Sequence, residues 1–303
     1  MKYSLLIALL ALVFGANAQH EWVYSMQSFN LYDGIGAAAG MYERSAINAR
    51  YRHQWVGVEG APQTALISYQ TRLNGRLGFG VRAMAETLGA FDRTATVAHI
   101  SWRSGLGKGE LAFALGGGVL YEKMSRDRIA ALHADDPALI GAPDQVAPLV
   151  NASALYRSER WFAGVEAQHL LPRESTWGEL TTTGKVAELT LFTGSTHALN
   201  DDWSVRLMAA LRYSTSRQLL PELQAGMWYR QNLWFGLGYR HAAAAYAFTE
   251  YRIRNKYRLA YNFGWPLMQY TVAPATAGNH ELMLGIFWGK SERRTLQSIR
   301  YFQ

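Results

Sequence analysis

The sequence predicts an all-β fold, a transmembrane antiparallel β-barrel of about 14 strands, within a range of roughly 12 to 16. Three observations lead to this prediction. The chain starts with an export signal, its segments alternate apolar and polar residues with a period of two, and its tight turns and long loops are sorted along the sequence. We therefore expect an exported chain that crosses the outer membrane with strands.

The export signal occupies the first residues. Met1-Lys2 gives a positive start, Leu5 to Phe14 is an apolar run, and Ala16-Asn17-Ala18 has the small-residue pattern of a cleavage site. The apolar run is too short for a membrane-spanning helix. The sequence thus predicts a signal peptide at 1–18, a barrel at 19–288 and a basic periplasmic tail at 289–303.

Composition narrows the class of protein without deciding it. The chain of 303 residues has no cysteine, a net charge of +7, 10 Trp, 17 Tyr and 12 Phe. Its mean hydropathy is −0.12, and no run of about 18 apolar residues follows the signal, which excludes a helical membrane protein. A barrel that alternates lipid-facing and lumen-facing residues has this averaged hydropathy, but so does a soluble β protein.

The alternation itself indicates strands. In the segment that starts at Trp161, Phe162 and Glu166 fall on the face opposite Trp161 and Val165. Applied to the whole chain, the same rule predicts strands near 45–53, 62–70, 76–87, 93–102, 109–122, 147–156, 160–169, 186–197, 202–214, 221–230, 233–240, 244–252, 256–263 and 279–288.

The connections favour a membrane barrel over a soluble sandwich. Tight turns follow even-numbered strands, at Asn74-Gly75, 157–159, Asn200-Asp201, Gln231-Asn232 and Arg254-Asn255. Long connections follow odd-numbered strands, at 123–146, 170–185 and 264–278. Outer-membrane barrels place short turns and both termini on the periplasmic side, and long loops outside. We also expect a type I′ turn at Asn74-Gly75, because both of its central positions need positive φ.

Aromatic and charged residues agree with this arrangement. Aromatic side chains near the expected strand ends are interpreted as interfacial girdles, with ordinary sheet core as the alternative. They are Tyr51, Trp55, Tyr121, Tyr156, Trp161, Tyr213, Trp228, Tyr229, Trp234, Tyr261 and Trp288.

Charges within strands should face the lumen, because an Arg on the lipid face costs roughly 2–4 kcal/mol at mid-bilayer. They are Arg50, Arg52, Arg82, Glu86, Glu166, Arg206, Arg212, Glu250 and Arg252. Either a polar pore or a filled interior follows, and we favour the filled interior.

One segment is similar to a known family. Residues Arg52 to Thr64 read RHQWVGVEGAPQT, Leu73 to Gly80 read LNGRLGFG, and Gly278 to Gly285 read GNHELMLG. These segments resemble the PorP/SprF family of outer-membrane proteins of type IX secretion and gliding machinery. The family's opening Asn-Pro-Ala-Tyr-Ala-Gly pattern is here Ile35 to Gly40, IGAAAG, without the Asn-Pro pair. The resemblance implies a role in assembling the machinery, or in holding a secreted protein at the surface through its C-terminal domain.

The expected contact residues lie on both sides of the membrane. Residues 55–62 fall in the first external connection and form either a plug or rim of the barrel mouth, which we favour, or a docking surface. For partner binding we select Trp55, Val58 and Glu59 outside, and Arg293 and Arg294 inside.

No catalytic, metal or cofactor site is expected. The eight histidines are dispersed, and neighbours such as His280 and Glu281 point to opposite faces of a strand. Gly116-Gly117-Gly118 lies in a strand pattern and is interpreted as a kink or bulge.

The sequence therefore predicts a non-enzymatic outer-membrane protein. Its expected partners are outer-membrane lipid, a secreted surface protein and type IX secretion components, with no nucleic acid. The alternative is a passive porin or small-solute transporter. A third class, an enzyme that uses His and Ser on the barrel wall, is not favoured.

Overall fold

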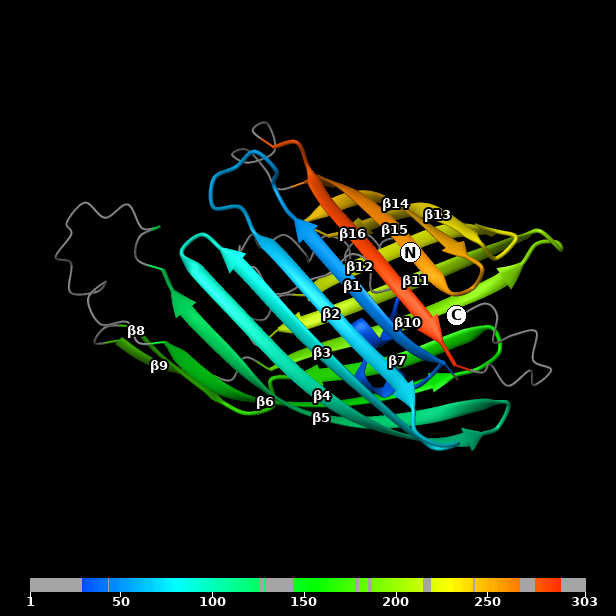
Figure 1. Cartoon of the computed structure of the whole chain (residues 1–303), viewed down its shortest axis with the longest axis horizontal. Coiled ribbons are helices and arrows are strands. Elements are labelled where there is room, and N and C mark those ends of the chain that lie inside the picture. Colours follow the sequence, from blue (N-terminus) through cyan, green and yellow to red (C-terminus); the bar gives the residue numbers. More distant parts are fainter. Residues whose placement is uncertain are drawn as a thin grey trace, which may run out of the picture.

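The computed structural model describes residues 29–42, 44–125, 128, 144–177, 180–184, 187–214, 219–241, 243–267 and 276–289. Fourteen strands form one closed antiparallel barrel, in which each strand pairs with its neighbours along the chain (Figure 1). They are β1 (Ser45–His53), β2 (Gln63–Arg72), β3 (Leu77–Leu88), β4 (Phe91–Leu106), β5 (Gly109–Met124), β6 (Gln145–Arg157), β7 (Trp161–Gln168), β10 (Glu188–Ala198), β11 (Trp203–Ser214), β12 (Leu219–Tyr229), β13 (Leu233–Arg240), β14 (Ala244–Ile253), β15 (Tyr257–Pro266) and β16 (Asn279–Trp288).

The barrel closes between its first and last strands. β1 pairs with β16 along its full length, from Ser45 opposite Trp288 to His53 opposite His280. Closure gives the strands partners on both sides, which hydrocarbon requires because lipid offers no hydrogen bonds to the backbone. This confirms the predicted fold and its fourteen strands. No helix among the described residues is long and apolar enough to cross a membrane.

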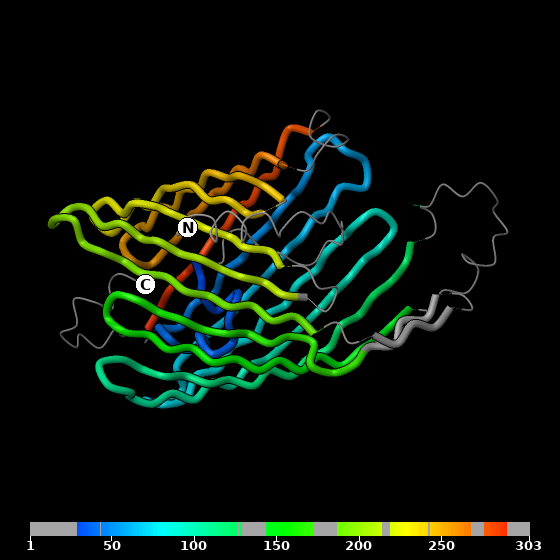
Figure 2. The backbone as a smooth tube through the Cα atoms, turned by 180° about the vertical axis from the view of Figure 1, so that it is seen from behind, coloured from blue at the N-terminus to red at the C-terminus, as the bar shows by residue number. Residues whose placement is uncertain are grey.

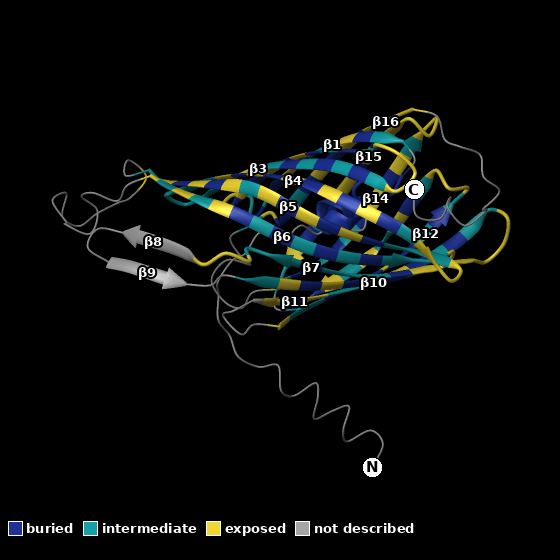
Figure 3. Cartoon of the chain, turned by 90° about the horizontal axis from the view of Figure 1, so that it is seen from below, coloured by how far each residue is buried: buried dark blue, intermediate teal, exposed yellow. Residues whose placement is uncertain are grey.

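Side chains alternate between the lumen and the outside along the strands (Figure 3). Apolar residues such as Ile100, Leu115 and Leu237 are 60%, 70% and 66% exposed and form the lipid-facing surface. The strand charges that we expected to face the lumen do so: eight of the nine are buried, and the ninth, Arg252, is partly buried. The cost of placing charge in lipid explains this sorting.

Two of the expected girdle residues belong instead to the interior. Tyr51, Trp161 and Tyr261 are exposed as expected, but Trp228 and Trp234 are only 3% and 1% exposed. Their rings stack on each other inside the lumen, with centroids 5.4 Å apart. Proximity to a strand end therefore indicated the wrong face for this pair, because the girdle prediction ignored the two-residue period.

The long connections lie at one rim, as the sequence predicted, and most tight turns lie at the other (Figure 1). The exception is the two-residue connection between β3 and β4, Gly89-Ala90, which lies at the rim of the long connections. By the outer-membrane pattern the tight-turn rim is periplasmic. The connection after β7 contains an additional hairpin, β8 (Arg173–Trp177) and β9 (Leu180–Gly184), which pair only with each other.

The turn at Asn74-Gly75 differs from the expected type. Neither residue has positive φ. Instead, Asn74 Oδ1 accepts hydrogen bonds from the N–H groups of Arg76 and Leu77, at 2.9 and 2.8 Å. Positive φ at two adjacent positions occurs elsewhere, at Arg254 and Asn255, both at 51°. An Asx-type turn thus replaces the predicted type I′ turn, because the Asn side chain can satisfy the turn's amides by itself.

A chain segment inside the barrel was not predicted. Residues 29–42, called here the inner segment, contain two short 3₁₀ helices, η1 (Leu31–Asp33) and η2 (Gly36–Ala38), and lie within the ring of strands (Figure 2). All fourteen residues are buried. The lumen is therefore filled by a piece of the chain as well as by strand side chains.

Glycines in the strands make room for the inner segment. A Cβ at Gly80 of β3 would lie 2.4 Å from Cζ of Tyr32, and one at Gly164 of β7 would lie 2.9 Å from Cδ1 of Ile35. Gly116 similarly leaves space for the His99 ring. β5 pairs with β4 without interruption at 116–118, so these glycines form no β-bulge.

We predict that Gly80→Ala destabilises the barrel by roughly 1–3 kcal/mol, because the added methyl group overpacks against Tyr32. Gly117→Ala is the matched control, since a Cβ there has open space and should change little. Urea-dependent unfolding in lipid vesicles measures both. Equal stability of the two variants would contradict a close fit of the inner segment.

Candidate functional site: the filled lumen and the outer rim

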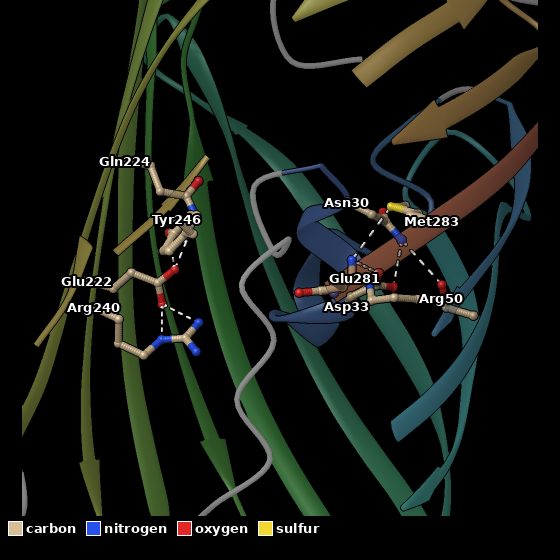
Figure 4. Close-up of polar contacts among 10 residues, drawn as sticks. Asn30, Asp33, Arg50, Glu222, Gln224, Arg240, Tyr246, Glu281 and Met283 are labelled. Atoms are coloured by element: carbon tan, nitrogen blue, oxygen red, sulfur yellow. Dashed lines mark hydrogen bonds and ion pairs between the residues drawn. The ribbon is translucent and has the colours of Figure 1, made fainter. Parts of the chain in front are cut away.

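The inner segment is bound to β1 by a buried ion pair (Figure 4). Asp33 Oδ2 of η1 lies 2.7 Å from Arg50 Nη2, and both side chains are 1% exposed. Glu281 of β16 lies 3.5 Å from the same guanidinium. Asn30 donates to Asp33 Oδ1 at 2.7 Å. A buried charge needs such partners, because it has lost its hydration.

A second polar network holds η2 against the opposite wall. Glu166 of β7 accepts from the backbone N–H of Gly36 at 2.8 Å and from Arg82 Nη2 at 3.0 Å. Arg82 also donates to the carbonyl of Asp33 at 2.9 Å. His99 lies 2.8 Å from Arg82 Nη2, and its Nδ1 is 3.2 Å from the Tyr32 hydroxyl. The Tyr32 hydroxyl donates this bond when His99 Nδ1 carries no proton.

The ends of the inner segment are held through their carbonyl groups. Ser101 and Arg103 of β4 donate to the carbonyl of Ala39, and Arg72 of β2 donates to the carbonyl of Gly40. At the other end, Arg258 of β15 donates to the carbonyl of Phe29 at 2.6 Å. Strands on several sides of the lumen thus bind this segment, which satisfies backbone groups that would otherwise be unpaired.

The lumen on the long-loop side holds a separate group of charged residues (Figure 4). Glu222 Oε2 of β12 accepts from Arg240 Nε and Nη2 of β13 at 3.0 and 2.9 Å. Its Oε1 accepts from the Tyr246 hydroxyl at 2.5 Å. Nη1 of Arg212 on β11 lies 3.6 Å from Oε2 of Glu222. These side chains come from the adjacent strands β11 to β14 and pair with one another along one wall of the lumen.

The predicted external contact residues lie in the β1–β2 connection (residues 54–62), which is hydrogen-bonded to two neighbouring connections of the outer rim. The backbone of Val56 pairs with residues 277 and 278, through bonds of 2.8 and 3.0 Å, and Gly89 N–H donates to Gly60 at 2.9 Å. Trp55 has a positive φ of 46°, and its N–H donates to Asn279 Oδ1 at 3.0 Å. Trp55 and Val58 are half-buried, and Glu59 is exposed. The connection therefore ties β1–β2 to the neighbouring connections.

Arg293 and Arg294, as well as the predicted signal peptide, lie outside the described residues. The inner segment was missed because its sequence has neither strand nor helix periodicity. One signal was present: the segment Ile35 to Gly40, which we compared with the family's opening pattern, is the centre of the inner segment. Among the residues described, no three His, Cys, Asp or Glu side chains are grouped as metal ligands.

We predict that Asp33→Ala destabilises the protein by about 3 kcal/mol, because it removes the carboxylate at 2.7 Å from the buried Arg50 guanidinium. The control is Asp202→Ala, which removes the exposed pair with Arg230 at 2.9 Å and should have no measurable effect. Urea unfolding in vesicles compares them. A silent Asp33→Ala variant would show that the inner segment is not held by this pair.

Comparison with known proteins gives the family of the chain. None of the curated proteins compared with it matches. Among solved structures, it is similar to a Pseudomonas aeruginosa FadL homologue (TM-score 0.49, 10% identity, covering 86% of this chain and 93% of that one). It is also similar to the Ralstonia pickettii toluene transporter TbuX (TM-score 0.47, 11% identity, 88% and 93%). A third similar structure is Acinetobacter baumannii Omp33 (TM-score 0.45, 8% identity, 83% and 100%).

The family of the chain is assigned from its sequence, by the match to a family model. The model of the family described as type IX secretion system membrane protein PorP/SprF matches residues 17–286, which is most of the chain. This match includes the inner segment, the β1–β2 connection and all fourteen barrel strands apart from the end of β16. The chain belongs to the PorP/SprF family of type IX secretion system membrane proteins and is a β-barrel of the outer membrane.

Proposed function

We propose that this barrel is a non-enzymatic platform of the type IX machinery, which assembles with or anchors a secreted surface protein. The main support is the inner segment, which occupies the lumen through buried contacts to strands on opposite walls. A lumen occupied in this way suits a rigid support better than a passage for solutes.

The two rims have different roles in this proposal. The outer rim, with Trp55, Val58 and Glu59, receives the C-terminal domain of the secreted protein. This connection is already held by hydrogen bonds to its neighbours, so little conformational entropy is lost when a partner binds it. The periplasmic rim and the tail with Arg293 and Arg294 contact secretion components. The positive charge of the tail favours an acidic partner surface.

We predict that the wild-type protein shows no steady conductance in planar bilayers. Removing residues 30–41 should open a conducting path, because these residues fill the lumen. Heat-modifiable migration on gels tests whether the shortened chain still forms a barrel. Steady conductance of the wild-type protein would favour a passive porin and contradict the platform.

We predict that the tagged wild-type protein, purified from detergent-solubilised outer membranes, carries a stoichiometric secreted protein that mass spectrometry identifies. Replacing Trp55 and Glu59, as Trp55→Ala with Glu59→Lys, should lower its recovery about tenfold or more, because buried aromatic anchors dominate interface energies. His241→Ala, in the β13–β14 connection on the same rim, is the matched control. A solitary barrel from wild-type cells would refute the anchoring role.

A further inference from the structure

The exposed charges of the tight-turn rim are unevenly distributed around the barrel. The turns β14–β15, β2–β3 and β4–β5 follow one another across the seam between β1 and β16. They carry four exposed basic side chains and no acidic one, and form what is called here the seam arc: Arg254, Lys256, Arg76 and Lys108.

The remaining three tight turns form the opposite arc, which has a different charge. The turns β6–β7, β10–β11 and β12–β13 carry two basic and three acidic side chains: Arg160, Arg230, Glu159, Asp201 and Asp202. The sum of these charges is −1, whereas the sum for the seam arc is +4. Positive charge is therefore concentrated at the place where the barrel closes.

Equivalent arginines of the two arcs differ in their partners. Arg230, in the β12–β13 turn, lies 2.9 Å from Asp202 through its Nε. Arg254 has the same place in the β14–β15 turn but no ion partner among the described residues. Both arginines have positive φ, at 48° and 51°, where Asn or Gly is more easily accommodated. The charge of Arg254 is thus kept at a costly backbone position without a partner in the described chain.

Apolar side chains place the seam arc at the membrane surface. Leu73 and Leu106 are exposed and continue the lipid-facing sides of β2 and β4 up to the turns. Trp288 at the end of β16 stacks on Tyr69 of β2, with ring centroids 6.1 Å apart. Exposed Trp and Tyr rings at the end of a spanning strand lie at headgroup level. The turns just beyond them therefore reach the lipid headgroups of the periplasmic leaflet.

The contact of Lys256 shows where one of these charges is directed. Its Nζ lies 5.3 Å from the centroid of the Tyr257 ring, which is a cation–π distance. Tyr257 is the first residue of β15, and its side chain is exposed on the lipid-facing side of that strand. The ammonium group is therefore on the outer side of the barrel wall, next to lipid.

We propose that the seam arc binds the phosphate groups of anionic phospholipids in the periplasmic leaflet. Its position at headgroup level and its charge together select this occupant. The sequence next to the arc does not neutralise it, since residues 290–303 have four basic and one acidic side chain, and Glu43 is offset by Arg44. This inference goes beyond the proposed function, because it concerns the lipid around the barrel and not the secreted partner.

The test measures which lipid stays with the folded protein. The full chain is refolded into vesicles with equal parts of phosphatidylglycerol, which is anionic, and phosphatidylethanolamine, which is zwitterionic. Mass spectrometry quantifies the lipid that remains with the protein after gentle detergent extraction. We expect enrichment of phosphatidylglycerol at low salt and loss of this enrichment in salt of about 1 M, because added ions screen the charges.

Two double variants locate the binding surface. Arg254→Gln with Lys256→Gln should lower the preference for phosphatidylglycerol about fivefold or more, since one basic side chain near an anionic surface is worth roughly that factor. The matched control, Arg160→Gln with Arg230→Gln, removes two charges from the opposite arc and should leave the preference unchanged. Heat-modifiable migration shows whether each variant forms a barrel. If the first variant does not fold, Arg76→Gln with Lys108→Gln tests the other side of the seam.

Three results would overturn the inference. In the first, wild-type protein retains both lipids equally at low salt. In the second, both double variants lose the preference equally, so that the overall charge of the protein attracts the lipid. In the third, phosphatidylglycerol is not enriched, but the seam-arc variant loses a secretion component in affinity purification, so that the arc binds an acidic protein. The lipid measurement does not involve the secreted surface protein, so the platform is tested separately.

Discussion

The structure depends on the exclusion of charge from lipid. Arginines and glutamates on the strands face inward, since the lipid face would make each of them costly. They then need partners in a lumen that fourteen strands make too wide to be filled by strand side chains alone. The inner segment supplies those partners: Asp33 for Arg50, and backbone groups for Glu166, Arg82 and Arg258. The strands carry glycine at positions such as Gly80 and Gly164, because a larger side chain there would collide with the inner segment.

Sequence patterns predicted most of the barrel because its rules are local. A period of two predicts a strand and its lipid-facing side, and β1 and β16 begin and end at the predicted residues. Asn74 marked a turn correctly but not its geometry, which depends on a side-chain bond that composition does not reveal. Trp228 and Trp234 show the limit of reasoning from strand ends, since only their strand parity assigns them to the lumen.

The interior was harder to predict because its contacts are long-range. Gly36 and Glu166 are 130 residues apart in the chain, and nothing in either neighbourhood indicates the bond between them. The run Ile35 to Gly40 was recognisable only as a departure from a family pattern. Its small side chains suit a segment packed closely against strand backbones, as the contact of the Ala39 carbonyl with Ser101 shows. The partner-binding residues at the rim remain predictions from sequence.

The inner segment also constrains the order in which the molecule can be assembled. It precedes β1 in the chain, whereas the seam of the barrel joins β1 to the last strand, β16. While the sheet is open, the segment can reach its position from the side. After the seam closes, access is left only through the two mouths. The inner segment must therefore reach its position in the lumen before or while β1 pairs with β16. Substitutions that weaken its contacts should first slow or prevent the insertion of the barrel into the membrane.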